Sequence, residues 1–459
     1  MQISMATGSI QDLDLRMEIS RKHILQLALP ISAAILVPQI NYITNNIFLS
    51  WLGKEELGAA GITGVFYLVF GTIGYGLNNG LQALIARRAG ENRPEEIGRL
   101  FSQAVRIALV IAAVGIVITW FLAPMIFNNV LHNDENVNRV ISFLKIRIWG
   151  LPFLYIYQMR NALLVGTNQS RYLIIGTLAE TITNIVLDYG LIFGNLGLPE
   201  LGFNGAAYAS VIAEATGMFV VLGVIHVKGI GKRFHIYSNL KFDKVTSKLL
   251  LVQSSPLIFQ YAISLISWEF FFILVERNAS YNYDLAISNM MRNIFGFFGV
   301  FTWAFAATSS TMVSNIIGQK RNDEVQPLIM KIVQLSTGLS VMVCIVLNIF
   351  PETILGIFGQ DPGFISHAIP VLRIVSVAMI LMSFSTVWLN AVVGTGNSKI
   401  NLMIEAVTVV LYSIYVYVVL EKLRLPITWA WGSEWLYWTS MFIPSFLYIR
   451  SGRWRGKVI

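Results

Sequence analysis

Long apolar runs separated by short polar segments dominate the chain. A helix needs about 20 mostly apolar residues to cross the hydrocarbon core of a bilayer, and the sequence contains twelve runs of this kind. They span approximately residues 24–51, 58–86, 100–123, 140–164, 172–193, 203–226, 249–275, 284–310, 328–350, 366–392, 400–420 and 427–449. The pattern predicts an all-α polytopic membrane protein with twelve transmembrane helices.

The composition supports the same interpretation. Of 459 residues, 55% are hydrophobic and 13% are charged, about half the ~25% that is usual in soluble domains. So few charges cannot cover the surface of a soluble protein of this length, which excludes a soluble enzyme and a disordered chain. The formal net charge of +8 would ordinarily suggest nucleic-acid binding. We expect no such partner, because basic residues in cytoplasmic loops explain the excess.

Lysine and arginine are distributed unequally between the two sides of the predicted membrane. The side that holds both termini and the even-numbered loops carries 21 of the 33 basic residues, and the opposite side carries 5. Cytoplasmic loops are the ones enriched in Lys and Arg. We therefore expect both termini in the cytoplasm and the chain in the plasma (inner) membrane, surrounded by lipid.

The chain repeats itself at a spacing of 228 residues. GENRPEEI (90–97) matches GQKRNDEV (318–325), and VGTNQSR (165–171) matches VGTGNSK (393–399). Matches at one shift, each at the same point of a six-helix unit, indicate an internal duplication. An even number of spans per unit gives both halves the same orientation. We therefore expect two six-helix lobes related by a pseudo-two-fold axis along the membrane normal.

Five segments are expected from these boundaries. Pro30 and Pro256 stand 226 residues apart in the first helix of each lobe, and we expect them to act as hinges. A cleft between two such lobes would allow alternating access to either side of the membrane. The segments are a cytoplasmic N-terminal segment (1–23), an N-terminal lobe (24–226), a basic cytoplasmic linker (227–248), a C-terminal lobe (249–449) and a basic cytoplasmic tail (450–459).

Several stretches resemble the multidrug and toxic compound extrusion (MATE) family of the MOP superfamily. TNIVLDYGLIFGNLGLPELGFNGAAYAS (183–210) is similar to the family's fifth helix, outer loop and sixth helix. ALPISAAILVPQINYITNNIFLSWLG (28–53), GLQALIARRAG (80–90), FLKIRIWGLPF (143–153) and the two VGT loops add to the resemblance, which covers nearly the whole chain. It implies a pair of six-helix lobes and export of amphiphilic, often cationic small molecules. The export would be driven by H⁺ or Na⁺, with no other cofactor.

Acidic residues inside the predicted spans are the candidates for coupling to a cation, because a charge in a span costs roughly 2.5–3.5 kcal/mol. Glu180, Asn184 and Asp188 share one face of the fifth span at spacings of four residues. Ser210 and Glu214 are likewise four residues apart on the sixth span. Oxygen ligands in this arrangement suit a proton or a small cation. The alternative is that these groups hydrogen-bond across helices and only hold the helices together.

The resemblance places cation-binding residues of the N-terminal lobe at Asn184, Asp188 and Ser210, with Ser210 in place of the usual Thr; together they would form a Na⁺ site. Many prokaryotic members also have an Asp fifteen residues after the proline of the first helix, and here that position is Asn45. An Asn cannot carry a proton, although its amide oxygen can bind a cation. We therefore hypothesise that Glu180 and Asp188 carry the coupling together, since two nearby carboxylates repel each other when both are charged.

The predicted substrate cavity draws on both halves of the chain. Glu269 falls near a helix-7 glutamate that other branches of the family use, and beside Trp268 it could hold a cationic substrate with help from the aromatic face. The alternative is an ion pair between Glu269 and Arg292 on the eighth span. Further cavity candidates in the first half are Asn41, Tyr42 and Asn161.

Together these features predict a secondary active antiporter and not an enzyme. The GxxxxGK[ST] loop of ATP-driven proteins and the HExxH motif of zinc hydrolases are absent. One alternative is a lipid-linked oligosaccharide flippase of the same superfamily, although these usually have fourteen spans and a basic cavity. A membrane-embedded transferase is a weaker alternative. Carboxylates serve H⁺ and Na⁺ alike, so the coupling ion stays open, and we expect a monomer.

Overall fold

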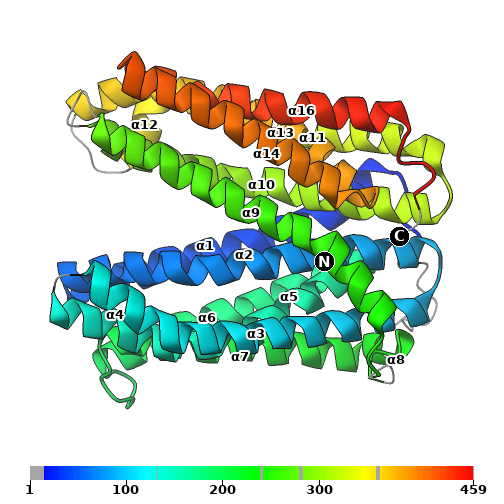
Figure 1. The fold of residues 1–459 in the computed structure, drawn as a ribbon, viewed down its shortest axis with the longest axis horizontal. Helices are drawn as coiled ribbons and strands as arrows, with labels where there is room; N and C mark the ends of the chain where they lie inside the picture. Colours follow the sequence, from blue (N-terminus) through cyan, green and yellow to red (C-terminus); the bar gives the residue numbers. More distant parts are fainter. Residues whose placement is uncertain (1–14, 132, 238–240, 279–282, 358–361, 458–459) are drawn as a thin grey trace, which may run out of the picture. The chain divides into compact units, whose positions relative to one another are not determined.

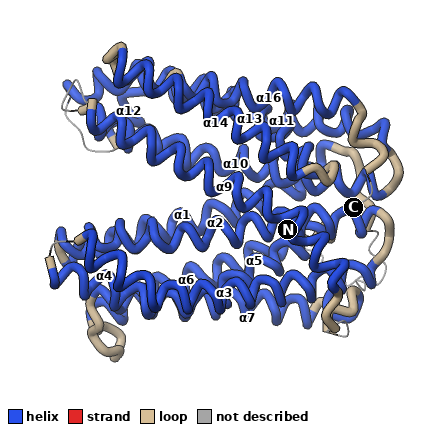
Figure 2. The backbone as a smooth tube through the Cα atoms, viewed as in Figure 1, coloured by secondary structure: helices blue, strands red, loops and turns tan. Residues whose placement is uncertain are grey.

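The computed structural model describes residues 15–131, 133–237, 241–278, 283–357 and 362–457. Within its helices, the side chains of Tyr42, Lys54 and Val130 lie outside the described part, so the prediction for Tyr42 falls there. All regular structure in the described residues is helical, as Figures 1 and 2 show. This agrees with the all-α class expected from the sequence.

A helix occupies each of the twelve predicted spans. The fourth span is α4 and α5 joined by the 3₁₀ turn Ile148–Gly150, the eleventh is α14 extended by the π turn Val418–Lys422, and the twelfth is α15 with α16. Within the described residues, ten of the helical segments are long and apolar enough to cross a membrane. The helices are α1 (Arg21–Leu52), α2 (Lys54–Gly90), α3 (Pro94–Val130), α4 (Asp134–Arg147), α5 (Leu151–Gly166), α6 (Leu173–Phe193), α7 (Phe203–Val227), α8 (Ile230–Arg233), α9 (Lys244–Arg277), α10 (Asp284–Gly318), α11 (Val325–Ile349), α12 (Pro351–Gly356), α13 (Pro362–Gly394), α14 (Ser398–Tyr417), α15 (Ile427–Trp431) and α16 (Ser433–Ser451).

Local chemistry explains several helix ends. Pro94 opens α3, where its missing N–H would have had no partner in any case. The Asn133 side chain caps α4 by accepting hydrogen bonds from the backbone N–H groups of Glu135 (2.9 Å) and Asn136 (3.5 Å). Gly194 ends α6 with φ of 69°, in the left-handed region that glycine adopts without strain.

The contacts divide the chain into two compact units. Unit 1 is Ala33–Val252 with the segment that ends at Met17, and unit 2 is Glu18–Ser32 with Gln253–Ile459. The boundaries therefore lie inside α1 and α9, close to Pro30 and Pro256, whereas the expected lobes begin at 24 and 249. The start of each of these helices is held by the other half of the sequence.

Two hydrogen bonds show how these helix starts are held. In unit 2, the ammonium group of Lys331 on α11 donates to the backbone oxygen of Ile19, 3.1 Å away. In unit 1, the amide of Gln103 on α3 donates to the backbone oxygen of Lys241 (2.8 Å), just before α9. Gln103 and Lys331 stand 228 residues apart, so the two holding points occupy equivalent positions of the repeat.

Each unit has its own apolar core. In unit 1 the core gathers around Phe127, Phe143 and Phe203, and the rings of the last two lie 4.6 Å apart. In unit 2 the core includes Phe271 and Trp431, whose rings meet edge to face at 5.2 Å. Aromatic pairs of this geometry add to the stabilisation from buried area.

The hairpin of α6 and α7 positions the acidic stripe in unit 1. Its turn is closed by a hydrogen bond from the Leu201 N–H to the Leu191 oxygen at 2.8 Å. At Gly205, on α7, a Cβ atom would lie 2.5 Å from that same Leu191 oxygen. Only glycine therefore allows the two helices to approach this closely.

Gly205→Ala is expected to destabilise the hairpin, because the added methyl collides with backbone that cannot rotate away. Overpacking of this kind costs about 1–3 kcal/mol. The matched control is Gly223→Ala on the same helix, where a Cβ would meet nothing within 4 Å. Thermal unfolding in detergent measures both, and equal midpoints for the two variants would contradict the packing described here.

Asp243 caps the start of α9 from outside the membrane-spanning segment. Its carboxylate accepts hydrogen bonds from the N–H groups of Val245 (2.9 Å) and Thr246 (3.3 Å) and from the Thr246 hydroxyl (2.6 Å). The hydrogen bond from that hydroxyl is the main reason why the pKa of Asp243 is lowered. A lowered pKa means that the carboxylate favours the folded state.

Asp243→Ala is expected to weaken the first turn of α9 by about 0.5–2 kcal/mol, while Asp243→Asn, which retains a cap, is expected to cost far less. The difference in helix stability between the wild type and Asp243→Ala should reach its full size above the ordinary Asp pKa of about 3.9. It should disappear as the pH falls through the lowered pKa of the folded state. Hydrogen exchange of the first turn measures this, and a difference that grows toward acid would contradict it.

Candidate cation site

The acidic stripe on α6 lies inside unit 1. Asp188 has no exposed surface and Asn184 is 1% exposed, whereas Glu180, two turns before Asp188, is partly buried. Both carboxylate oxygens of Asp188 and both amide atoms of Asn184 have no hydrogen-bond partner among the described residues. These are the most completely unsatisfied neighbouring polar groups in the described part of unit 1.

An unsatisfied buried polar group costs about 1–3 kcal/mol, and more when it is charged. Asp188 and Asn184 therefore require a ligand that the protein itself does not supply: water, a proton on the carboxylate or a bound cation. Together they offer three oxygen atoms, which is the chemistry that Na⁺ and similar hard cations prefer. The site fits either form of coupling.

The end of α1 packs against α6 beside this pair. The ring of Phe48 lies 6.5 Å from that of Tyr189 and 6.0 Å from that of Phe193. Asn45 is one turn before Phe48, and Asp188 directly precedes Tyr189. The amide oxygen of Asn45 is buried and has no hydrogen-bond partner in the described residues, which adds a further oxygen at this level of the unit.

Two other predicted cavity residues in unit 1 have the same property. The side-chain oxygens of Asn41 on α1 and Asn161 on α5 are buried without a hydrogen-bond partner in the described part of the chain. Near Asn161, the hydroxyl of Tyr157 is hydrogen-bonded to that of Thr177 on α6 at 3.0 Å. The interior of unit 1 is thus lined by amide oxygens as well as by carboxylates.

Glu214 has a different environment, because its carboxylate is already paired. The guanidinium group of Arg147 on α4 donates to both of its oxygens, at 2.5 and 2.8 Å. The Tyr67 hydroxyl on α2 lies 3.3 and 3.4 Å from the same oxygens and 3.0 Å from Arg147. A Cβ atom at Gly150 would collide with both members of the pair. Glu214 was expected to bind the coupling cation with Asp188, and the structure instead makes it the partner of Arg147.

Arg147 is the one basic group in the described residues whose charge acts on all three of these carboxylates. Arg147 acts electrostatically on Glu180 as well as on Glu214, and also on Asp188. One positive charge thus faces three carboxylates, so Glu180 and Asp188 remain uncompensated when both are ionised. Ser210, on the α7 face that also carries Glu214, is partly buried. It forms no described hydrogen bond.

Arg147 and Tyr67 are functional neighbours that the sequence alone did not identify. The two partners of the ion pair are separated by 67 residues, and no local pattern links them. A signal was present nonetheless, because a basic residue inside a span requires a partner. Arg147 stands in the same stretch as Lys145, whose ammonium lies over the Trp120 ring.

The predicted cavity residues of unit 2 do not form the alternative ion pair. Glu269 and Arg292 are both exposed, and no described ion pair joins them. Arg292 lies over the ring of Phe272, 4.7 Å from its centroid. Trp268 stacks on that ring at 6.1 Å. Glu269 thus forms no ion pair in the described part of the chain, and its role in a substrate cavity stays a prediction.

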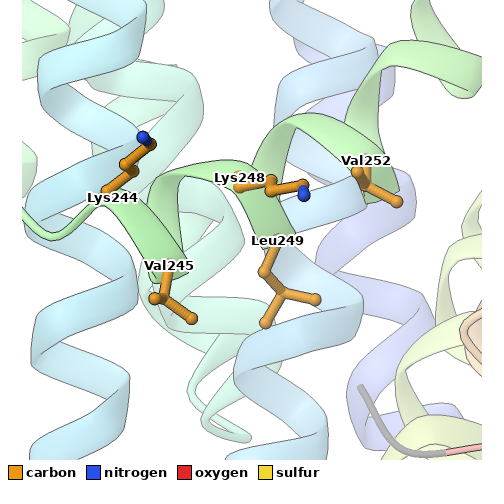
Figure 3. Close-up of a pocket in the computed structure, with 5 residues that line it drawn as sticks. All are labelled: Lys244, Val245, Lys248, Leu249 and Val252. Atoms are coloured by element: carbon orange, nitrogen blue, oxygen red, sulfur yellow. The ribbon is translucent and has the colours of Figure 1, made fainter.

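A separate shallow groove lies at the start of α9, in unit 1. Figure 3 shows the side chains that line it: Lys244, Val245, Lys248, Leu249 and Val252. Two basic and three apolar residues form its wall, and no carboxylate is among them. The groove is therefore unsuited to a cation and separate from the site at Asp188.

The fold and the site together define a class of protein: a polytopic helical membrane transporter whose acidic groups lie inside its spans. The chain belongs to the MatE family, whose pattern matches residues 30–190 and 256–418. This is a family of transporters and not of enzymes. The two matched segments correspond to the two halves of the internal repeat.

Related proteins of known name agree with this assignment. A probable multidrug resistance protein NorM from Thermotoga maritima is 22% identical over 451 residues, covering 96% of this chain and 94% of the relative. A probable NorM from Synechocystis is 28% identical over 202 residues, covering 43% of each. For that second relative, the match therefore spans less than half of its length.

Solved structures share the fold. A MATE protein in complex with MaL6 superposes with a TM-score of 0.87 at 18% identity, covering 95% of this chain and 97% of the other. A MOP superfamily transporter from Pyrococcus furiosus, described as having a binding pocket of reverse polarity, superposes with a TM-score of 0.84 at 17% identity, covering 95% and 96%. At these identities the likeness establishes the fold alone.

Arg147→Ala is expected to destabilise the protein by about 3–5 kcal/mol, because it leaves Glu214 charged, buried and unpaired. The double variant Arg147→Met with Glu214→Leu should recover most of this loss, since it removes both charges together. The control is Arg93→Ala, which breaks the partly exposed pair with Glu96 and should cost at most about 1 kcal/mol. Thermal unfolding measures all three, and a double variant no better than the single would refute the pairing.

Proposed function

We propose that the protein exports amphiphilic, cationic small molecules by antiport, in exchange for H⁺ or Na⁺ entering the cell. The substrate class is supported by the NorM names of its relatives and by the two carboxylates of unit 1, Glu180 and Asp188, that form no described ion pair. One observation supports the coupling to a cation. Asn184 and Asp188 are buried, and none of their side-chain polar atoms has a hydrogen-bond partner in the described residues.

A bound cation or proton would satisfy the pair, and its release would leave an uncompensated charge inside the membrane. The two states therefore differ in free energy by an amount that depends on the cation concentration on the exposed side. A conformation that closes this site while opening the substrate cavity would couple the two fluxes by alternating access. The unpartnered carboxylate of Asp188 makes this a site for cations.

Glu180 would share the cation with Asp188, since both carboxylates face the single charge of Arg147. Asn45, Ser210 and Asn41 would add neutral oxygens to the same cavity. Glu214 would stay ion-paired with Arg147 and neutralise its charge, and it would not bind the exchanged cation itself. In unit 2, Glu269 with Trp268 would receive the cationic substrate through charge and aromatic contact.

The charge of the binding site says more about the substrate class than the fold does. A protein of the same fold is described as having a binding pocket of reverse polarity and a suggested different function. Glu180 and Asp188, which would repel an anionic lipid-linked sugar, favour a cation exporter over a flippase for such substrates.

The wild type is expected to lower the accumulation of a cationic dye in an efflux-deficient host. Asp188→Asn is expected to lose this export, so that the dye accumulates as in cells without the protein, because the amide cannot exchange a proton and binds cations weakly. Glu180→Gln should reduce export strongly, by the same reasoning. Glu95→Gln, an exposed acidic change at the start of α3, serves as the control and should export like the wild type. Normal export by Asp188→Asn, at equal expression, would contradict the proposed coupling.

Vesicles with separately imposed gradients identify the coupling ion. The protein is reconstituted and dye uptake is followed with a pH gradient alone and with a Na⁺ gradient alone. We expect one of the two gradients to drive transport in the wild type and neither to drive it in Asp188→Asn. Transport that needs no ion gradient would contradict antiport and favour a facilitated flippase.

A further inference from the structure

A second buried carboxylate lies in unit 2, and the export cycle described above does not use it. Glu405 is in α14 and is 1% exposed. Its Oε1 atom is 2.5 Å from the Ser264 hydroxyl on α9 and 2.5 Å from the Tyr437 hydroxyl on α16. The Gln260 amide on α9 donates to Oε2 at 3.3 Å. Three helices thus converge on one carboxyl group.

Every partner of Glu405 is neutral. No Lys, Arg or His forms an ion pair with it among the described residues, in contrast to Glu214, which has a guanidinium on both oxygens. A carboxylate buried inside a membrane span without a counter-charge is unstable, so it is neutralised by a proton or by a bound cation. The geometry distinguishes between these two solutions.

The short contacts favour hydrogen bonding with the two hydroxyl groups over a bound cation. Oxygen atoms 2.5 Å apart are in the range of strong O–H···O hydrogen bonds. Two ligands of one metal ion are held farther apart, because each lies at 2.3 Å or more from the ion. The Glu405 oxygen and its two hydroxyl neighbours are therefore placed to share hydrogens and not to surround an ion.

Counting hydrogens leads to the same conclusion. The Ser264 hydroxyl has one hydrogen but two acceptors in reach, the Gln260 backbone oxygen at 3.0 Å and Glu405 Oε1 at 2.5 Å. If Glu405 is protonated, its O–H donates to Ser264 Oγ, and Ser264 donates onward to Gln260. Both contacts are then satisfied, while Tyr437 donates to the carboxyl group.

A stripe of buried polar side chains runs along α14 on both sides of Glu405. Ser398, Asn401, Thr408 and Tyr412 follow at helical spacing and are all nearly inaccessible. Asn401 donates to the side chain of Gln260, and its own oxygen has no partner in the described residues. The Thr408 hydroxyl, one turn beyond Glu405, is also unpartnered there. Asn401 and Thr408 therefore offer polar atoms on both sides of Glu405 to which water can hydrogen-bond.

The titratable groups around Glu405 are few. From α16 they are Tyr437 and Glu434, and Glu434 accepts a hydrogen bond from Trp438 at 3.0 Å. On α14 itself the nearest is Tyr412, whose ring lies 5.5 Å from that of Tyr437. The α9 residues that contact Glu405 are neutral. On α13, the titratable residues His367 and Arg373 are both exposed.

We propose that Glu405 is a second proton-binding site of this protein, located in unit 2 and connected along the polar stripe of α14. On loading, a proton from water forms an O–H bond at Oε1 that is donated to Ser264. On release, this bond breaks, the proton returns to water, and the Ser264 and Tyr437 hydroxyls both donate to the carboxylate. The repeat-equivalent position in unit 1 is Thr177, so the site belongs to one half only.

Infrared difference spectroscopy of the purified protein in bilayers, between acid and alkaline pH, tests this proposal. We expect a carboxyl C=O band in the wild type that is lost in Glu405→Gln and kept in Glu434→Gln, the matched buried glutamate of the same unit. An unchanged difference spectrum in a folded Glu405→Gln would overturn the proposal. The test needs no substrate, so its outcome is independent of the proposed export.

Two further variants keep the test decisive if Glu405→Gln does not fold. Ser264→Ala and Tyr437→Phe each remove one hydrogen bond and should shift the frequency of the band without abolishing it. A band that neither variant moves would overturn the assignment. At constant pH, replacing choline chloride by NaCl should leave the band unchanged, and its loss on adding Na⁺ would show that the site takes a cation in place of the proton.

Discussion

A charge inside the membrane must be neutralised, and this constraint organises the interior of the protein. Hydrocarbon offers no solvation, so each buried carboxylate requires a basic partner, a proton or a bound cation. The described residues include three kinds of environment. Glu214 is paired with Arg147, Glu405 is surrounded by neutral hydroxyl and amide groups, and Asp188 has no partner in the described residues.

Acidic residues that look alike in the sequence therefore have different capacities to bind a proton or a cation. A permanent ion pair fixes α4 against α7 and has little capacity to exchange a cation. An unpartnered carboxylate beside an amide, in contrast, changes its free energy whenever a proton or cation arrives. The close approach of α6 and α7 at Gly205 fixes the position of the helix that carries Asn184 and Asp188.

The sequence predicts whatever depends on local periodicity. The twelve spans, the repeat and the shared face of Glu180, Asn184 and Asp188 all follow from spacing along one helix. The pairing of Glu214 with Arg147 could not be predicted, because it depends on which face α4 presents to α7. The convergence on Glu405 involves α9, α14 and α16, which are distant in sequence. Glu269 and Arg292 illustrate the converse, since neighbouring helices suggested an ion pair that the exposed side chains do not make.

The central claim is that Asp188 with Asn184 binds the coupling cation. The most direct test is equilibrium binding to the purified protein without substrate, measuring proton uptake with a pH indicator and Na⁺ binding with a radioactive tracer. The account predicts saturable binding of one of these cations to the wild type that is lost in Asp188→Asn and retained in the exposed control Glu95→Gln. Undiminished binding of both cations by a folded Asp188→Asn would contradict it.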